Sequence, residues 1–587
     1  MSSFTEHDSE KLIPFTEYAS EGLILEMLIK ERAKVAIKNK LKATSPSIIE
    51  YKIEQGEKLS IEEHIFTMMP ARNLWCRPQK RDRFLKDSNE AKTTKQILTR
   101  SIALAIKKHR TSYEKYPYLK RLDAFIGEIR KDITSKEPLK FDSLKIFGKK
   151  KKIKDGITIL RPLCIFDSLR EKLLVALASK YLTLVFDKLL HEEILSYRPL
   201  RIYHNGNTPI LTNRDNAIDN IQHYRKVHKG KNIYVAECDI QKYFDTINHD
   251  IIRSCLSAHA KKIQESHPEF EYTEVERIID AYLNSYSFYN NITIKNEKLR
   301  QEKQNKIYES PDKKLFIQRG CYTEEEFMAS THKIGIPQGG ALSVLISNIV
   351  LSTVDNESIL TEENDKEKCF CRYGDDIILM HTSKEKCKEL IDKYCKKLTE
   401  YKLLYHSLES VTKTEYRRND GTVSANLWNM KSRSPFLWGR DCNEKEQMDW
   451  IGFLGYEIRY TGEVRLRRSS LDDKFKNIKR KYYSGAKTLI AKGKSKKDIE
   501  AEILNRLERF KCNGFATAKS LNINKYCMTQ ALKLDSYTSK NLYRLLYKIA
   551  RNNNLSDKQL AYWWSIAKES GCINNRRSYI EISSKKK

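Results

Sequence analysis

Three aspartates at strand ends limit the folds open to this chain more than any other feature. The segment KNIYVAECDI (231–240) has the pattern of a strand that ends in a carboxylate, at Asp239. The segment KCFCRYGDDIILMHT (368–382) has the pattern of two short strands joined by a turn that carries Asp375 and Asp376. If these strands are neighbours in one sheet, their carboxylates can hold a pair of Mg²⁺ ions, because Mg²⁺ prefers oxygen ligands.

The aspartates alone leave two interpretations open. Gly-Asp-Asp is common in ordinary solvated turns, which need no ligand. A catalytic site is the alternative, since two metal ions about 3.5–4 Å apart stabilise the attacking and leaving oxygens of a phosphoryl displacement. Adjacent aspartates also repel each other, so nearby cations would stabilise the pair. The sequence that flanks the aspartates distinguishes a solvated turn from a catalytic site.

Length and charge narrow the class of protein. The 587 residues exceed what one core usually needs, so we expect two or three domains. With 40% hydrophobic residues the chain has ample material for packed cores, which excludes wholesale disorder. Lysine and arginine total 108 against 77 acidic residues, a net charge of +31. Such an excess favours a polyanionic partner, most commonly nucleic acid, over a merely basic soluble protein.

Cysteine usage and the apolar segments predict a cytoplasmic protein. The 13 cysteines form no Cys-x-x-Cys pair, and no histidine cluster stands near Cys369 and Cys371 to complete a zinc site. Reduced thiols are therefore expected. The N-terminus lacks the basic and apolar regions of a signal peptide. The uncharged segment 335–354 contains Pro337 and two adjacent glycines, so we expect a buried loop and helix there and no membrane partner.

Local patterns predict several further elements. The basic tract KIFGKKKKIKDG (145–156) ends in Asp-Gly between β-branched residues, which indicates a β-hairpin. Ser168-Leu-Arg-Glu171 has the pattern of a capping box before a helix. A second cap, Thr382-Ser-Lys-Glu385, precedes a helix whose apolar face would be formed by Cys387, Leu390, Ile391, Tyr394 and Leu398.

Five segments, in order along residues 150–467, resemble the motifs of reverse transcriptases. They are RPLCIFDSLREKLL (161–174), ECDIQKYFDTINHD (237–250), GIPQGGALSVLISNIVL (335–351), RYGDDIILM (372–380) and WIGFLGYEIRYTGEVRLR (450–467). The resemblance implies an α+β right-hand polymerase, with fingers, a palm built on an antiparallel sheet, and a helical thumb. It also implies an RNA-directed DNA polymerase that uses dNTPs to add dNMP units to a 3′-hydroxyl.

The resemblance divides the chain into three regions. Residues 1–95 are expected to be a helical N-terminal extension, from the apolar spacing in EGLILEMLIKERAKVAIKNKL. Residues 96–460 would hold fingers and palm, with surface insertions near 298–330 and 415–447, where the chain is polar. Residues 461–587 would form a basic helical thumb and C-terminal region.

By resemblance, Asp239, Asp375 and Asp376 are the catalytic residues. They would hold two Mg²⁺ ions, with Mn²⁺ as a substitute, and the backbone carbonyl of Ile240 would be a further metal ligand. The family also has a lysine after the palm helix. Lys413 is a candidate for it, with an exposed solvated lysine as the equal alternative.

The resemblance further implies a set of nucleotide-binding residues, namely Lys154, Arg161, Phe244, Gln338, Gly339 and Tyr373. Phe244 would be a steric gate that rejects a 2′-hydroxyl, with a core aromatic as the alternative. Lys154 lies one residue further from Arg161 than the family spacing predicts. At Gly339 we expect that a side chain would obstruct the backbone near the nascent base pair. A further departure is Val344, where many relatives have proline, which should affect a loop or helix start rather than the chemistry.

A basic segment follows the palm motifs. Residues 464–497 contain thirteen lysines and arginines, and KFKNIKRKYY (474–483) interleaves them with aromatic residues. In a thumb such a helix would contact the phosphate backbone, whereas a charge run alone favours a solvated helix face. The expected nucleic-acid-binding residues are Arg465, Arg467, Arg468, Lys474, Lys476, Lys479, Arg480 and Lys481.

The sequence indicates the subgroup of reverse transcriptases less specifically than it indicates the family. No zinc-binding nuclease cluster and no retron-type signature is visible, and the long N-terminal helices resemble the prokaryotic defence-associated (abortive-infection) reverse transcriptases. That group implies antiviral defence with a structured noncoding RNA as template or scaffold, a DNA product, and a homo-oligomer or partner protein. Three alternatives stay open: a retron-type or group II intron-like enzyme of a mobile element, untemplated or protein-primed synthesis, and a non-catalytic RNA-binding scaffold.

Overall fold

A computed structural model describes most of the chain up to residue 466. The described residues are 12–38, 46–79, 93–198, 200–202, 209–211, 214–361, 365–411, 413–417, 423–425, 430–439 and 447–466. The chain forms two compact units. The first contains Met1–Thr212, Ile240–Glu363 and Asp392–His406, and the second contains Asn213–Asp239, Asn364–Ile391 and Ser407–Lys587.

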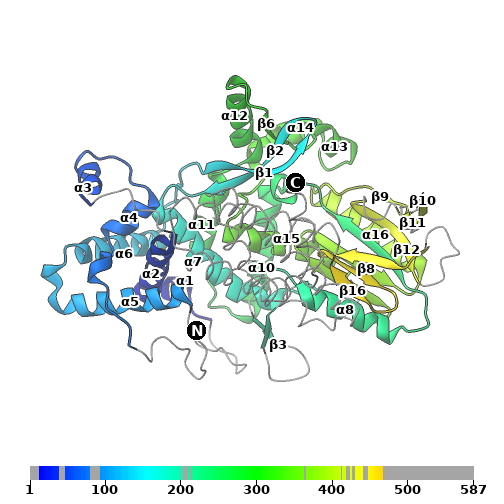
Figure 1. The fold of residues 1–587 in the computed structure, drawn as a ribbon, viewed down its shortest axis with the longest axis horizontal. Helices are drawn as coiled ribbons and strands as arrows, with labels where there is room; N and C mark the ends of the chain where they lie inside the picture. The colour runs from blue at the N-terminus through cyan, green and yellow to red at the C-terminus, as the bar shows by residue number, and fades with distance from the viewer. Residues whose placement is uncertain are drawn as a thin grey trace, which may run out of the picture. The chain divides into compact units, whose positions relative to one another are not determined.

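The N-terminal part of the first unit is helical. In α2 (Glu21–Lys38) the side chains of Ile24, Leu28 and Val35 are buried at helical spacing, which is the pattern expected from the sequence. The neighbouring helices in this part, shown in blue in Figure 1, are α1 (Phe15–Tyr18), α3 (Pro46–Glu54), α4 (Ile61–Thr67), η1 (Arg72–Leu74), α5 (Thr94–His109), η3 (Arg110–Lys115) and α6 (Tyr118–Thr134).

A β-hairpin follows these helices. Strands β1 (Lys145–Lys154) and β2 (Ile157–Ile165) are antiparallel, and β6 (Lys306–Tyr308) adds to β2 in parallel. At the turn, Asp155 and Gly156 have φ angles of 48° and 77°. Two positive φ angles characterise the type I′ turn that Asp-Gly favours. The hairpin expected at this dipeptide is confirmed.

Buried helices form the centre of the first unit. Helix α7 (Leu169–Phe186) packs against α10 (His249–Ser266), α11 (Thr273–Asn284) and α15 (Ala341–Glu357). The uncharged segment 335–354 is thus a loop followed by a buried helix. Among the described residues, no helix is long and apolar enough to cross a membrane. The remaining elements of this unit are η4 (Asp187–Leu189), β3 (Leu200–Ile202), β4 (Pro209–Leu211), α9 (Tyr243–Thr246), α12 (Phe288–Gln301), α13 (Lys313–Gln318), α14 (Glu324–Ser330) and η5 (Thr331–Lys333).

The polar segment near 298–330 contains a small core of its own. Phe316, Tyr322 and Phe327 are buried there, and their rings pack with centroids 5.5–5.7 Å apart. Cys321, Ile334 and Leu404 complete the buried cluster. The charged composition of the segment conceals these contacts, because the aromatic residues come from separate short helices and the loop between them.

The second unit is built on a mixed sheet with the strand order β13-β12-β5-β8-β7. Strand β5 pairs antiparallel with β12 and with β8, and β8 pairs antiparallel with β7, whereas β9 and β13 lie parallel to β12. The strands are β5 (Tyr234–Asp239), β7 (Lys368–Tyr373), β8 (Asp376–His381), β9 (Leu408–Glu409), β12 (Ser432–Trp438) and β13 (Gln447–Met448). The expected α+β fold with an antiparallel pairing of the motif strands is confirmed.

Two smaller sheets and two helices complete the description. The sheets are β10-β11, of β10 (Lys413–Arg417) and β11 (Val423–Ala425), and β14-β15-β16, of β14 (Trp450–Phe453), β15 (Tyr456–Arg459) and β16 (Val464–Leu466). Helix α8 (Arg214–Val227) packs against β7. Most of residues 461–587, where a helical thumb is expected, lies outside the described residues.

Helix α16 (Lys384–Glu400) follows β8, and its expected apolar face is buried. Its start differs by one residue from the expectation. The Ser383 hydroxyl accepts a hydrogen bond from the Lys386 backbone N–H (3.2 Å), so Ser383 is the N-cap. Thr382 instead donates to the carboxylate of Glu367. Both residue types can cap a helix, and only this tertiary contact decides which one does.

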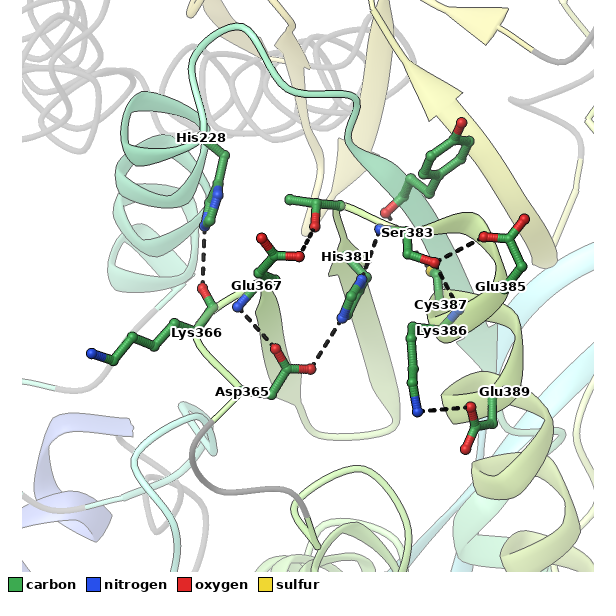
Figure 2. Close-up of polar contacts among 12 residues, drawn as sticks. His228, Asp365, Lys366, Glu367, His381, Ser383, Glu385, Lys386, Cys387 and Glu389 are labelled. Atoms are coloured by element: carbon green, nitrogen blue, oxygen red, sulfur yellow. Dashed lines mark hydrogen bonds and ion pairs between the residues drawn. The ribbon is translucent and has the colours of Figure 1, made fainter.

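Figure 2 shows a set of polar contacts that holds the segment before β7, residues 365–367. The Asp365 carboxylate accepts from the His381 ring (Nε2, 3.0 Å) and from the Glu367 backbone N–H (2.9 Å). The other nitrogen of His381 accepts from the Ser383 backbone N–H (2.8 Å), so we place the ring proton on Nε2. The pKa of Glu367 is lowered to about 2, mainly by its bond with Lys231.

We expect Asp365→Ala to destabilise the second unit by about 2 kcal/mol. The reason is that the buried His381 ring and a backbone N–H both lose their acceptor. Urea unfolding followed by circular dichroism measures the change. The control is Glu389→Ala, whose exposed ion pair with Lys386 (3.1 Å) should contribute less than about 1 kcal/mol. Equal stability of the two variants would contradict this role of Asp365.

Candidate active site

The register of the central sheet brings the predicted carboxylates together. Asp239 is the last residue of β5 and pairs directly with Asp376, the first residue of β8. Side chains of such antiparallel pairs have Cβ atoms about 5 Å apart and lie on the same face. Asp375 lies in the turn of the β7–β8 hairpin, between the paired residues Tyr373 and Asp376. The three aspartates, and Tyr373 beside them, therefore converge at one end of the sheet.

The charges at this end of the sheet are unfavourable in the absence of a cation. The pKa of Asp376 is raised to about 7, first by loss of solvation and then by the negative charges of Asp375 and Asp239. Asp376 is nevertheless an exposed residue, and the water on its open side screens part of this effect. The direction of the shift means that positive charge near Asp376 is stabilising, and the nearby Lys431 already opposes the rise.

Lys431 is a residue of this site that sequence reasoning missed. Its ammonium group lies 2.8 Å from Oδ2 of Asp239, and the neighbouring Ser432 hydroxyl accepts from the Asp239 backbone N–H (3.0 Å). Only the antiparallel pairing of β12 with β5 brings these residues to Asp239, and no local pattern marks Lys431. The side chain of Lys413, the candidate from the sequence, lies outside the described part of the structure.

Two buried arginines support the strands that carry the aspartates. Arg433 of β12 forms an ion pair with Glu237, which it faces across the β5–β12 ladder two residues before Asp239. Arg372 of β7 donates to the carbonyl of Gly374 (3.3 Å) in the hairpin turn. Removing one partner of a buried ion pair leaves an uncompensated charge, so loss of either Arg433 or Glu237 should be strongly destabilising.

The residues present fit a magnesium site of the kind completed by a substrate. The donors are carboxylate oxygens, which Mg²⁺ prefers, and they come from two directly paired strands and the turn beside them. Over the described ranges, no three His, Cys, Asp or Glu side chains are arranged to hold a metal by themselves. Mg²⁺ in phosphoryl-transfer sites is commonly bound by one or two carboxylates together with substrate phosphates.

We expect Lys431→Met to increase the affinity of the site for Mn²⁺ several-fold. The Lys431 ammonium neutralises Asp239 and would have to give way to a metal ion there. Electron paramagnetic resonance of free Mn²⁺ measures the binding. Lys393→Met, which removes an exposed lysine that bonds Thr361 on the first unit, is the control. Weaker binding in Lys431→Met would show that the lysine does not compete with the metal.

The predicted triphosphate-binding residues lie on the β1–β2 hairpin of the first unit. Arg161 is exposed and faces Lys149, with a bulge at Lys151 beside it. Lys154 pairs with Ile157 next to the turn, roughly 13 Å from Arg161 along the strand at about 3.3 Å per residue. The bulge lies outside the interval from Lys154 to Arg161 and does not explain the additional residue noted there. It shifts the register so that Lys149 faces Arg161, which makes Lys149 a nearer neighbour of Arg161 than Lys154 is.

The predicted gate residue and the proline-glutamine-glycine segment also lie in the first unit. Phe244 of α9 is half-buried, with its ring centroid 5.7 Å from that of Tyr243. Gln338 is half-buried and Gly339 exposed. A Cβ added to Gly339 would meet no described atom within 4 Å, so space within the chain does not require glycine here, and the approach to a nascent base pair stays a prediction. Instead its φ of 100° accounts for glycine, because other residues rarely adopt that conformation.

The remaining predicted site residues are placed as follows. Ile240 is buried and forms an isolated β-bridge with Tyr405. Arg465 belongs to β16, but its side chain is outside the described part of the structure, as are Arg467, Arg468, Lys474, Lys476, Lys479, Arg480 and Lys481 in full.

A sheet with three aspartates at adjacent strand ends is the arrangement of a nucleotidyltransferase that uses divalent metals. The sequence model described as "Reverse transcriptase (RNA-dependent DNA polymerase)" matches residues 149–458, more than half of the chain. The chain therefore belongs to the reverse transcriptase family. This confirms the family expected from the motifs, whose model describes RNA-dependent DNA polymerases and whose members generally use divalent metal ions.

Several solved structures are similar to part of this chain. A C-terminally truncated apo telomerase from Candida tropicalis is 12% identical with a TM-score of 0.33, over 55% of this chain and 54% of that one. Telomerase from Candida albicans with a fragment of telomeric RNA is 12% identical with a TM-score of 0.34, over 78% of this chain and 69% of that one. This chain thus spans about half of the first of these structures. A comparison with curated protein sequences gives no significant match.

Proposed function

We propose that this protein is an RNA-directed DNA polymerase that transfers deoxynucleotidyl groups to a 3′-hydroxyl and releases pyrophosphate. The observation that supports this most is the direct pairing of Asp239 with Asp376 beside Asp375, within a chain of the reverse transcriptase family. Two Mg²⁺ ions held by these carboxylates would stabilise the charge that develops on the transferred phosphoryl group. The carbonyl of Ile240 would be a further ligand.

The residues of the first unit would bind the nucleotide. Arg161 can hold phosphate oxygens in a bidentate manner, with lysines of the β1 bulge as neighbouring point charges. Phe244 would exclude a 2′-hydroxyl, and Gln338 with Gly339 would contact the nascent base pair. Tyr373, beside Asp376 in the sheet, would lie near the primer terminus or nucleotide. The basic residues from Arg465 to Lys481 would contact the nucleic-acid backbone.

We further propose the division into a helical extension (1–95), fingers and palm (96–460) and a basic thumb region (461–587). The sequence resemblance favours a cytoplasmic enzyme of bacterial antiviral defence that works with a structured noncoding RNA and forms an oligomer or binds a partner protein. The net charge of +31 supports a nucleic-acid partner.

Product sequencing tests the proposed function. The protein is purified with its bound nucleic acid, supplied with Mg²⁺ and labelled dNTPs, and also given a defined RNA template with a DNA primer. Products complementary to the RNA support the proposal, and a product copied from one co-purified RNA identifies the dedicated partner. A homopolymer unrelated to any RNA present would show that the synthesis is untemplated. No incorporation on any template, with RNA still bound, would favour a scaffold and overturn the proposal.

A further inference from the structure

A buried carboxylate lies next to the predicted gate residue. Asp245 follows Phe244 in α9, and only 6% of the residue is exposed. Burying a charged group is costly unless it is paired. Burial raises the pKa of Asp245 to about 6, and the bond from Gln338 and the charges of Lys242, Lys151 and Arg161 oppose the rise. Near neutral pH this carboxylate is therefore mainly ionised inside the protein.

The partner of Asp245 is the glutamine of the proline-glutamine-glycine segment. Nε2 of Gln338 donates to Oδ1 of Asp245 at 2.7 Å. An ionised carboxylate can only accept hydrogen bonds, so Gln338 has to present its NH₂ group to it. The amide oxygen of Gln338 then points away from Asp245, and among the described residues no donor contacts that oxygen. The charge of Asp245 thus determines which way the amide faces.

The main chain holds the two segments in a fixed position relative to each other. The Ile336 N–H donates to the carbonyl of Phe244 (2.8 Å), and the Gly335 N–H donates to the carbonyl of Ile247 (2.8 Å). From the other side, the Cys164 N–H of β2 donates to the carbonyl of Gln338 (3.1 Å). These hydrogen bonds therefore fix the backbones of Phe244 and Gln338. The hydrogen bond to Asp245 then fixes the conformation of the Gln338 side chain.

The close approach of these segments depends on Gly335. A Cβ at this position would lie 2.7 Å from Cβ of Phe288 and 3.2 Å from the carbonyl oxygen of Asp245, and the φ of Gly335 is 94°. The His249 ring, whose pKa burial lowers to about 4, bonds the Gly335 carbonyl through Nε2 (2.8 Å). The neutral ring can donate there through Nε2. The segment that carries Gln338 is thus packed directly on the backbone that carries Asp245.

We propose that Asp245 is a positioning residue that orients the Gln338 amide, so that its oxygen accepts a hydrogen bond from the incoming nucleotide or the nascent base pair. The inference rests on the proposed polymerase function and adds a residue to the part of the site that selects nucleotides. Asp245 does not touch substrate in this scheme and acts through Gln338.

The test measures the Kd of the next correct dNTP on a primer with a dideoxy terminus, and kcat and KM on an extendable primer. We expect Asp245→Ala to raise Kd and KM about 10-fold, the effect of about one lost hydrogen bond, and to change kcat less than about 3-fold. Asp245→Asn can accept from Gln338 but can also donate to it, so it should restore the affinity only in part. Gln338→Ala should resemble Asp245→Ala, and the double variant should be no worse than either.

Asp250→Ala is the matched control, because Asp250 is an exposed carboxylate in the same stretch that pairs with Lys333 (3.1 Å). Its Kd should equal that of the wild type. Additive effects of Asp245→Ala and Gln338→Ala, or an unchanged Kd in Asp245→Ala, would overturn the inference while leaving the proposed function intact. A loss of kcat that follows a loss of thermal stability would show a merely structural role and also overturn it. A wild type that extends no primer would instead refute the proposed function.

Discussion

Asp239→Asn is expected to lower the rate of nucleotide addition at least about 1,000-fold. Asp239 pairs directly with Asp376, so its carboxylate is placed to bind the same cations. Asparagine keeps the size of the side chain and removes its charge. A catalytic metal contributes several kcal/mol of transition-state stabilisation, and each 1.4 kcal/mol corresponds to a factor of ten.

The same substitution should leave the fold intact. The Ser432 hydroxyl bonds the backbone N–H of Asp239, which asparagine retains. Because the charge of Asp239 raises the pKa of Asp376, its removal should lower that pKa and relieve repulsion. The loss of the ion pair with the exposed Lys431 opposes this gain, so we expect Asp239→Asn to unfold at about the same temperature as the wild type in the absence of metal.

Single-nucleotide primer extension under rapid mixing measures the rate, and Mn²⁺ binding provides a readout that does not depend on activity. Glu389→Gln, at an exposed position on α16, is the control and should retain full activity. Retention of more than about a tenth of the wild-type rate by Asp239→Asn would exclude Asp239 as a metal ligand in the reaction.

Phe244→Ala is expected to increase the use of ribonucleotides relative to deoxyribonucleotides up to about 100-fold. The ring is half-buried, and the bond from Ile336 to its carbonyl fixes the backbone from which it projects. A rigid ring beneath the sugar would clash with a 2′-hydroxyl, and overpacking costs about 1–3 kcal/mol. Removal of the ring removes this penalty for rNTPs and leaves dNTP binding less affected.

The ratio of kcat/KM for rGTP and dGTP opposite the same template base measures this effect. Phe244→Tyr keeps the ring and should keep the discrimination. If the ratio in Phe244→Ala equals that of the wild type, Phe244 is a core aromatic residue, the alternative that the sequence left open.

Local patterns predicted those parts of the fold whose causes are local. The Asp155-Gly156 hairpin follows from the positive φ angles that these two residues tolerate. The buried face of α16 follows from the 3.6-residue period. The start of α16 was misplaced by one residue, because Thr382 and Ser383 can both cap a helix and the contact of Thr382 with Glu367 comes from elsewhere in the chain.

Contacts between distant segments could not be predicted from such patterns. Lys431 lies 192 positions from Asp239, and the Gln338–Asp245 bond joins residues 93 positions apart. The bulge at Lys151 likewise changes which lysine neighbours Arg161, and counting residues along the chain does not reveal it. Each of these depends on strand pairing or segment packing that the local sequence does not encode.

The sequence by itself therefore determined the family, the fold class and the three aspartates as the candidate catalytic residues, because each is marked by residue types within a short stretch. The tertiary structure decided the pairing of Asp239 with Asp376, the counter-ion at Asp239 and the orientation of the Gln338 amide. The physical reason is that the alternating pattern of a strand specifies which of its side chains lie on the same face of the sheet. The register and the choice of neighbouring strands specify which charged side chains lie next to one another. The shifted pKa values of Asp376 and Asp245 arise from these contacts between distant segments and from burial.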